Sequence, residues 1–183
     1  MKKICFTLAL VIVFILTGCG GESSNVENSS PEVSFEEKTS HLPEEAITQL
    51  NELPDEVKGV LRIPTEFPSE PSLSVMANPP KGDIVMVLTH YFGDDSKWSV
   101  MVHTYPNGDG VGEEIENTEK IKLDNGAEIE YHTDEADEGE KVHFIQWREE
   151  SGVFHLIQLM QNYENPKDEV TKDKFIEIVN SMK

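Results

Sequence analysis

A series of short segments with a period of two constrains the fold of this chain most strongly. Residues 84–92 and 98–105 are rich in β-branched and aromatic side chains and are separated by a Gly-Asp-Asp turn. Residues 121–129 and 142–161 repeat the same design around turns that contain glycine. Segments of this kind predict β-strands joined by hairpins. We therefore expect about six antiparallel strands from Asp83 onward.

The turns also predict the register of two hairpins. A three-residue loop, residues 124–126, sets Leu123 opposite Ala127, whereas a two-residue turn would set Leu123 opposite Glu128. The three-residue loop pairs apolar residues with each other and puts its glycine where a left-handed backbone is needed. We prefer it for this reason, and we expect the same form at residues 150–152.

Helical periodicity flanks the strands. Residues 43–53 carry apolar side chains at helical spacing, behind an acidic first turn and before a proline. Residues 171–182 predict a second helix, capped by Thr171, with an apolar stripe that includes Phe175. The proline-rich stretch at residues 64–71 is expected to be extended and irregular. The order predicts an α+β fold: an antiparallel sheet of about six strands with an N-terminal helix and a C-terminal helix packed on it.

The first 18 residues have the plan of a secretory signal peptide. Lys2 and Lys3 precede an apolar run of 13 residues, Ile4 to Leu16. At ~1.5 Å per residue a helix of this length spans about 20 Å, well short of the ~30 Å hydrocarbon core of a bilayer. The run is therefore suited to engage a translocon and poorly suited to remain as a permanent membrane span.

The tetrad Leu16-Thr17-Gly18-Cys19 resembles the lipobox of bacterial lipoproteins. In that family the signal is cleaved before the cysteine, which is linked through a thioether to diacylglycerol. The resemblance implies that Cys19 is the lipidated first residue of the mature chain. It also implies a protein held at the extracytoplasmic face of the cell membrane. The alternative is an ordinary cleaved signal, or a short anchor, with a cysteine there by chance.

Charge and cysteine content exclude several classes of partner and site. The chain has 35 acidic against 15 basic residues and a formal net charge of −20 at pH 7. Such a surface repels nucleic acid and anionic head groups, so no nucleic-acid partner is expected. Both cysteines, Cys5 and Cys19, lie within the first 19 residues. Once Cys5 is removed and Cys19 is lipidated, no disulfide, thiolate metal site or cysteine nucleophile can form.

The segment after Cys19 predicts a flexible tether. Residues 20–40 are rich in Ser, Glu and Asn, with few large apolar side chains, so they bury too little surface to offset their ordering entropy. The expected organisation is a signal peptide at 1–18, the lipidated cysteine and tether at 19–40, and a single α+β domain at 41–183.

A search for chemistry in the sequence finds little. No GxSxG, HExxH, GxxxxGK or GxGxxG motif occurs. In the preferred register His143 faces Leu159 and His155 faces Trp147, which separates the two histidines by about 13 Å along the strands, too far for one metal ion. The acidic loop at 109–116 lacks the ligand spacing of an EF-hand and is more simply a solvated surface. We expect no catalytic residue, no metal and no cofactor.

The strands at 142–149 and 153–160 are apolar on both faces. On the first strand Val142 and Phe144 share one face, and Ile145 and Trp147 share the other. A sheet in water needs only one apolar face, so something must cover the second. The cover is the two helices, another protein or an apolar ligand. The candidate ligand face contains Ile145 and Trp147.

The C-terminal part of the chain resembles a domain of unknown function. The features that carry the resemblance are a strand with Trp147, a turn at Gly152, an aromatic strand, and a closing helix that ends in Ser181 and Met182. The match extends back to the stretch that begins at Ile63. That family occurs in small lipoproteins of Bacillus-type bacteria and in extracytoplasmic parts of anti-sigma-like proteins. The resemblance implies a sheet of the kind used by lipoprotein carriers and sensors, and it implies no catalytic residues.

These observations lead to an expected function. We expect a membrane-anchored, non-enzymatic binding or sensing module outside the cell membrane. Its expected partners are the membrane itself, through Cys19, and an envelope protein or an apolar ligand. A cell-envelope enzyme without a recognisable motif is one alternative, and a structural spacer or assembly subunit is another.

Overall fold

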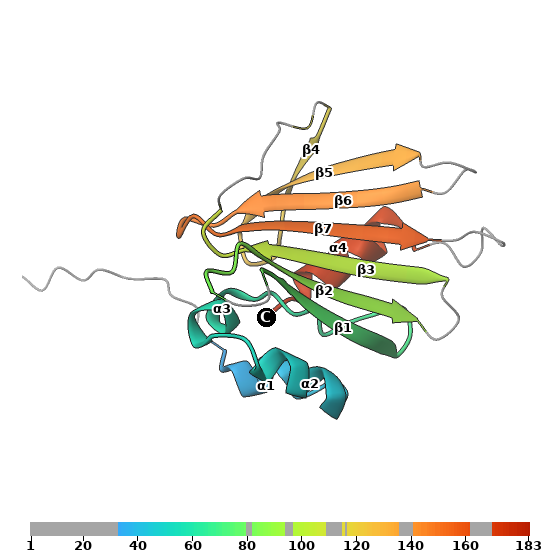
Figure 1. Cartoon of the computed structure of the whole chain (residues 1–183). Helices are drawn as coiled ribbons and strands as arrows, with labels where there is room; N and C mark the ends of the chain where they lie inside the picture. The colour runs from blue at the N-terminus through green and yellow to red at the C-terminus, as the bar shows by residue number, and fades with distance from the viewer. Residues whose placement is uncertain are drawn as a thin grey trace, which may run out of the picture. The chain divides into compact units, whose positions relative to one another are not determined.

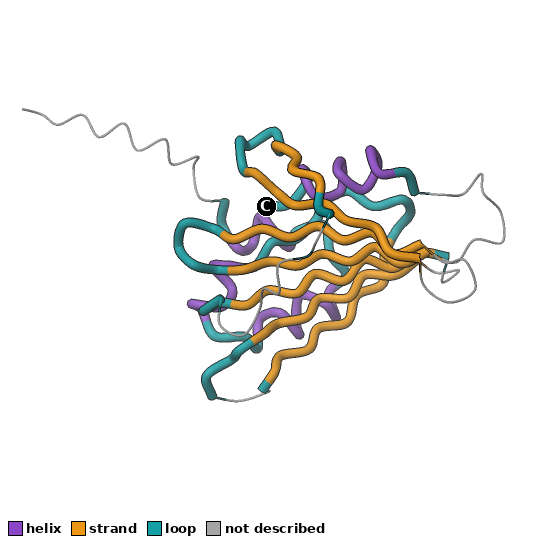
Figure 2. The backbone as a smooth tube through the Cα atoms, turned by 90° about the horizontal axis from the view of Figure 1, so that it is seen from above, coloured by secondary structure: helices purple, strands orange, loops and turns teal. Residues whose placement is uncertain are grey.

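The computed structural model describes residues 33–79, 82–93, 97–108, 115, 117–135, 141–161 and 170–183. The strands of these residues form one antiparallel sheet in the order β1-β2-β3-β7-β6-β5-β4 (Figure 1). Their bounds are β1 Pro71–Asn78, β2 Met86–Gly93, β3 Trp98–Tyr105, β4 Glu119–Lys122, β5 Glu128–Glu135, β6 Lys141–Arg148 and β7 Phe154–Gln161. In Figure 2 the strands converge toward one end of the sheet and fan out toward the other, as strongly twisted strands do.

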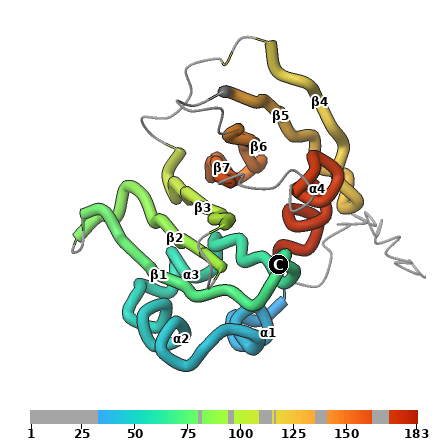
Figure 3. Tube along the Cα trace, turned by 90° about the vertical axis from the view of Figure 1, so that its right-hand side faces the viewer, coloured from blue at the N-terminus to red at the C-terminus, as the bar shows by residue number. Residues whose placement is uncertain are grey.

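Among the described residues, three short helices precede the sheet and one follows it. Their bounds are α1 Phe35–Thr39, α2 Glu44–Asn51, α3 Asp55–Val60 and α4 Lys172–Asn180. Figure 3 shows the sheet curving around α4. We call the sheet face that the helices contact the inner face, and the opposite one the outer face.

The core lies between the inner face and the helices. Alternate residues of the strands are buried there, as the period of two requires. Leu50 of α2 and Phe175 of α4 are completely buried in the same core cluster as Tyr91, Val100 and Ile157 of the sheet. The predicted fold class is therefore confirmed at the level of an antiparallel sheet with helices packed on it.

Both predicted hairpin registers are confirmed. The Leu123 amide donates to the Ala127 carbonyl at 2.8 Å, and the Glu149 amide donates to the Val153 carbonyl at 2.8 Å. The glycines that end the two loops have φ values of +88° at Gly126 and +95° at Gly152. Left-handed backbone of this kind favours glycine, and it is the property on which the three-residue loops were predicted.

The closing helix predicted from residue 171 is α4. The Thr171 hydroxyl accepts from the Lys174 amide at 3.3 Å, which is the predicted N-cap. Phe175, Ile178 and Val179 of the apolar stripe are buried, and Met182 packs at its margin.

The sheet has one strand more than expected. Residues 71–78, which follow the stretch expected to be irregular and were not predicted as a strand, form β1 and pair with β2, with Leu73 opposite Tyr91. Pro71 is compatible with this strand because it is the first residue of an edge strand. Ser72 and Ser74 alternate with Leu73 and Val75, but Met76 interrupts this alternation and prolines flank the segment, so the period of two is weak in the sequence.

The N-terminal region also differs from the expectation. It contains three short helices rather than one, and α1 lies within the residues predicted as tether. Ser34 caps α1, Phe35 packs at the margin of the core, and Lys38 and Thr39 are only 4% and 2% exposed. The folded unit begins at Val33, before the expected boundary at residue 41. The apolar ring of Phe35 indicates a folded segment, but the polar composition of the residues around it led to the prediction of a tether.

A clamp joins the end of the chain to the segment before β1. The backbones of Ile63 and Lys183 exchange two hydrogen bonds of 3.2 Å each. The Ser181 hydroxyl accepts from the amides of Thr65 and Glu66, both at 3.1 Å, and the Thr65 hydroxyl donates to the Ser181 carbonyl at 3.0 Å. The clamp therefore brings together the two ends of the region on which the family resemblance rests.

Candidate functional site

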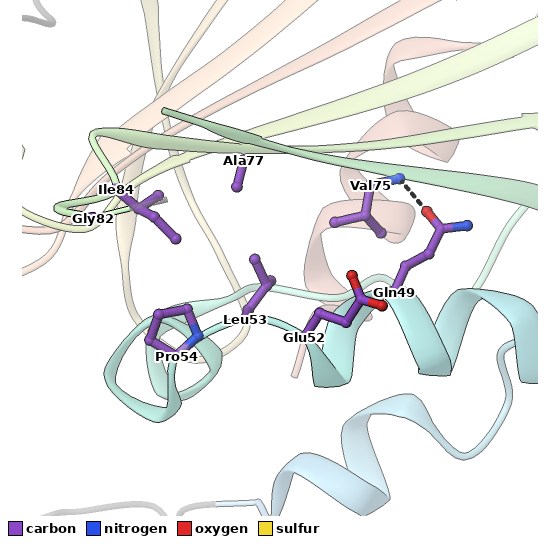
Figure 4. Close-up of a pocket in the computed structure, with 8 residues that line it drawn as sticks. All are labelled: Gln49, Glu52, Leu53, Pro54, Val75, Ala77, Gly82 and Ile84. Carbon is purple, nitrogen blue, oxygen red and sulfur yellow. Dashed lines mark hydrogen bonds between the residues drawn. The ribbon is translucent and has the colours of Figure 1, made fainter. Parts of the chain in front are cut away.

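A groove lies between helix α2 and the edge strand β1 (Figure 4). Its volume is about 520 Å³, within the ~300–1,000 Å³ typical of small-ligand pockets. The lining is mainly apolar, with Gln49 and Glu52 as its polar side chains and Gly82 at one end. The apolar lining residues are Leu53, Pro54, Val75, Ala77 and Ile84.

Local sequence explains why this groove forms. Helix α2 ends at Asn51, and Pro54 directly precedes α3, so the chain turns between the two helices. Figure 4 shows Leu53, from this turn, pointing toward β1. The opposite wall is the inner-face side of β1, where Val75 and Ala77 are half-buried.

One hydrogen bond crosses the groove. The side-chain oxygen Oε1 of Gln49 accepts from the Val75 amide at 3.1 Å (Figure 4). The Val75 amide therefore points away from β2, out of the edge of the sheet. Gln49 supplies an acceptor where a further strand would supply a carbonyl oxygen.

The rim of the groove is acidic. Glu52 lines it, Asp55 follows the lining residue Pro54, and Asp83 lies between Gly82 and Ile84. All three acidic side chains are exposed.

The outer face of the sheet is a second candidate surface. On β1, β2, β3 and β7 it carries no charged side chain, in a chain of which 27% of residues are charged. Its most exposed apolar residues are Met76 and Met160, at 55% and 37%. The residues of these four strands on the outer face are Ser72, Ser74, Met76, Asn78, Met86, Leu88, His90, Phe92, Ser99, Met101, His103, Tyr105, Phe154, Leu156, Gln158 and Met160.

The two histidines of this face favour the uncharged form. Burial lowers the pKa of His90 below its ordinary value. Burial also lowers the pKa of His103, and the nearby His90 adds to that effect, while the side chain of Gln158 opposes it. Both imidazoles are therefore neutral at pH 7, and the outer face stays without charge over these four strands.

A buried polar network lies on the inner face. His155 is 0% exposed, and its Nε2 lies 3.1 Å from Oε1 of Glu149 while its Nδ1 lies 3.3 Å from Oγ1 of Thr104. Nη2 of Arg62 lies 2.5 Å from the same Glu149 oxygen. The ring of Trp147 stacks on His155 with centroids 4.7 Å apart. A neutral imidazole satisfies both contacts by donating to the carboxylate and accepting from the hydroxyl.

Burial controls the protonation of this network. It lowers the pKa of His155 more than the neighbouring Glu149 raises it. Burial alone would raise the pKa of Glu149, but the hydrogen bond from His155 and the charge of Arg62 together hold it below its usual value. At neutral pH the pair is thus a carboxylate and a neutral imidazole.

The network contains the residue types of a nucleophile–base–acid triad, but its geometry does not support catalysis. Thr104 is only 1% exposed, and neither Thr104 nor His155 lines the groove between α2 and β1. A substrate therefore has no route to the hydroxyl through the groove. We interpret the network as a structural connection between β3, β7 and the segment at Arg62.

The candidate ligand face of Ile145 and Trp147 lies on the inner face. Ile145 is 0% exposed within the core. Trp147 is half-buried on His155 and also forms part of a shallow pocket of about 190 Å³ with Gln146, Arg148 and Phe154. The opposite face, which holds Val142 and Phe144, is the one that the helices leave uncovered. Apolarity on both faces was visible in the sequence, but which face meets the helices was not.

The other predicted site features concern lipidation, metal binding, the strand histidines and membrane spans. Cys19, the predicted lipidation site, lies outside the described residues. Within them, no three His, Cys, Asp or Glu side chains are placed to hold a metal ion together. His143 faces Leu159, and His155 faces Trp147, as the preferred register requires. Among the helices of the described residues, none has both the length and the apolarity needed to cross a bilayer.

The sequence did not predict the groove, and it predicted the outer face only as a second apolar face at residues 142–160. The groove depends on β1, and the only signal for β1 was the alternation of Leu73, Val75 and Ala77 with other residues. The outer face could have been found by asking which alternate positions of residues 86–105 and 154–160 lack charge.

Comparison of the chain with protein-family models, with curated proteins and with solved structures finds no match.

Proposed function

We propose that this chain is a non-enzymatic binding module, anchored outside the cell membrane through a lipid on Cys19, that binds an apolar envelope molecule or protein surface. The binding surface is the outer face of the sheet. The observation that carries the proposal is the absence of charged side chains from the outer face over the described strands β1, β2, β3 and β7.

Removing such a face from water is favourable. Apolar area contributes about 25 cal/mol per Å² on burial, and no charged group has to be desolvated without a partner. The cores of protein interfaces are depleted of charged residues in the same way. In a chain with a net charge of −20, a large uncharged face is the part of the surface best suited to an apolar partner.

The lipid anchor rests on the resemblance of residues 16–19 to a lipobox. Two or more acyl chains give stable membrane attachment, because each buried CH₂ contributes ~0.8 kcal/mol. The anchor would hold the domain near the membrane, where apolar envelope molecules and membrane proteins are found.

The outer face is tested with an environment-sensitive hydrophobic dye. The detergent-free chain with Cys19→Ala should bind the dye without loss of its folded circular-dichroism spectrum, and an extract of membrane lipids should compete. The double substitution Met76→Glu/Met160→Glu places charge at the two most exposed apolar positions of the face. It should weaken dye binding about tenfold or more.

The matched control is Val85→Glu. Val85 is 49% exposed but lies outside the strands of the outer face, so its substitution should leave dye binding unchanged. If lipid does not compete but a cross-linked envelope protein protects the same methionines, the partner is a protein. If the folded chain binds no dye, and no partner protects the face, the proposal fails in favour of a spacer.

The anchor has its own test. Wild-type chain expressed with a labelled fatty acid should take up the label, and Cys19→Ala should abolish uptake and yield an unprocessed or released protein. Cys5→Ala is the control and should incorporate label normally. Labelling that persists in Cys19→Ala would refute the anchor without touching the outer-face proposal.

A further inference from the structure

We infer that the groove between α2 and β1 receives an extended segment of a basic partner protein, which adds as a strand to the free edge of β1. This site is separate from the outer face, because it uses the edge of the sheet and the inner-face side of β1. The inference therefore stands or falls independently of the proposed function.

The edge of β1 presents backbone groups in the right direction. Among the described strands, β1 stands at the end of the sheet order and pairs with β2 alone. The Val75 amide points away from β2, as its bond to Gln49 shows. In an antiparallel pair, alternate residues point the same way, so the amides and carbonyls of Leu73 and Ala77 share this direction. An added strand would find this row of groups at the spacing that a β-ladder needs.

Gln49 occupies one position of that missing ladder. Its Oε1 satisfies the Val75 amide while no strand is present, which protects the edge from unspecific pairing. Gln49 is half-buried on the helix that faces the strand, so its side chain can turn aside without changing the core. A peptide carbonyl that bonds to Val75 must displace Gln49, and the displacement reduces the affinity.

The side chains around the groove define the composition of the segment. Leu53, Pro54 and Ile84 offer an apolar surface to those side chains of an added strand that point toward the helices. The same helix-facing side chains also meet the exposed carboxylate of Glu52, and the exposed Asp83 lies between two residues of the lining. Asp55 is already paired with Lys58 at 2.9 Å and contributes less charge. The complementary segment combines apolar and basic side chains.

A second copy of this chain is a poor occupant. With a net charge of −20, two copies repel one another. An edge-to-edge dimer would also place the acidic rims of both grooves close together. Charge complementarity therefore favours a basic partner over self-association.

The test uses the full chain in a zwitterionic detergent and three labelled octapeptides. One alternates Lys and Val, the second alternates Glu and Val, and the third is the Lys–Val peptide with alternate amides N-methylated on one edge. Fluorescence anisotropy should show the Lys–Val peptide binding at least tenfold more tightly than the other two. Hydrogen exchange should show new protection at the amides of Leu73 and Ala77.

Variants of the groove sharpen the test. Ala77→Pro removes one outward-pointing donor from an edge strand, where proline is tolerated, and should weaken binding about tenfold. Gln49→Ala removes the competing acceptor and should tighten binding by about twofold to tenfold, the size of one net hydrogen bond. A merely electrostatic contact would not respond to Gln49→Ala in this direction.

Charge variants decide the result if Ala77→Pro does not fold. Glu52→Lys/Asp83→Lys should weaken binding about tenfold at low salt, while the matched reversal of exposed charges Asp124→Lys/Glu150→Lys should have less than a twofold effect. Failure of the Lys–Val peptide to bind would overturn the inference. Equal binding of the N-methylated peptide would overturn strand addition and leave only adsorption to acidic residues. A dimer of the chain that Ala77→Pro abolishes would assign the edge to a second copy instead.

Discussion

Substitution of Gly108 by alanine tests how the end of β3 is held against the β6–β7 turn. Gly108 has a φ of +63°, and a Cβ at this position would overlap Nη1 of Arg148 and the carbonyl oxygen of Gly152. Arg148 donates from Nη1 to both backbone carbonyls there, at 3.3 Å to Gly108 and 2.9 Å to Gly152. The added methyl group therefore strains the backbone and displaces a side chain that bonds two loops together.

The cost follows from three effects. A left-handed alanine costs about 1–2 kcal/mol, and forcing a methyl group into occupied space costs about 1–3 kcal/mol. Weakening the Arg148 hydrogen bonds adds about 0.5–1.5 kcal/mol. We expect Gly108→Ala to lower the free energy of unfolding by about 3–5 kcal/mol. For a folded unit of this size the melting temperature should fall by roughly 6–20 °C.

Gly82→Ala is the matched control for the backbone effect. Gly82 also has a positive φ, +89°, but a Cβ there meets nothing within 4 Å. This variant should lose only about 1–2 kcal/mol, measured by urea unfolding monitored with tryptophan fluorescence. If Gly108→Ala and Gly82→Ala are equally stable, the close approach at Gly108 is not a feature of the folded protein and the reasoning is refuted.

Three further predictions concern other contacts of the fold. A chain beginning at His41 should melt roughly 3–10 °C below one beginning at Val33, because it lacks the buried contacts of α1. Equal melting temperatures would support the original expectation that the tether extends to residue 40. Gln161→Leu should lower the free energy of unfolding by about 2–5 kcal/mol, measured by urea titration. The Gln161 side chain accepts from the buried Val170 amide at 2.7 Å and donates to the Val170 carbonyl at 2.9 Å, and leucine leaves both groups without these bonds. Since the pKa of His155 is lower in the folded state than the ~6.5 of an unfolded chain, the unfolded state binds more protons as the pH falls below about 6.5. The free energy of unfolding should therefore decrease as the pH falls from above about 6.5 toward the pKa of His155 in the folded state. Between pH 7.5 and 5.5, His155→Gln should show a smaller decrease than the wild-type chain.

Local signals in the sequence were sufficient to predict the hairpins and the closing helix. The register of residues 121–129 followed from one glycine that had to adopt a positive φ and from pairing apolar residues with each other. The cap at Thr171 and the stripe that includes Phe175 followed from helical spacing. In each case the decisive interactions join residues close together in the chain, so a short window contains them.

Long-range pairing was not predictable in the same way. Strand β3 pairs with β7, with Val102 opposite Ile157, and no local pattern selects that partner. The groove requires α2 to lie beside β1, which again depends on contacts distant in sequence. The two faces of β6 are similarly apolar, so placing Ile145 inside and Phe144 outside depended on where the helices pack. A single sequence does not encode that choice in its periodicity.

The clamp between residues 63–66 and 181–183 affects when the domain can form. Thr65 and Ser181 are 116 positions apart in the chain, and the bonds of Lys183 to Ile63 close the same loop. During synthesis, the hydrogen bonds of Ile63 and Thr65 to this segment cannot form until residues 181–183 have left the ribosome, and β3 lacks β7 until shortly before that. A nascent chain of this design therefore cannot complete the domain before these residues are available. If the leader proposed here directs export, a domain that residues 181–183 complete late would be compatible with passage of the chain through a translocon.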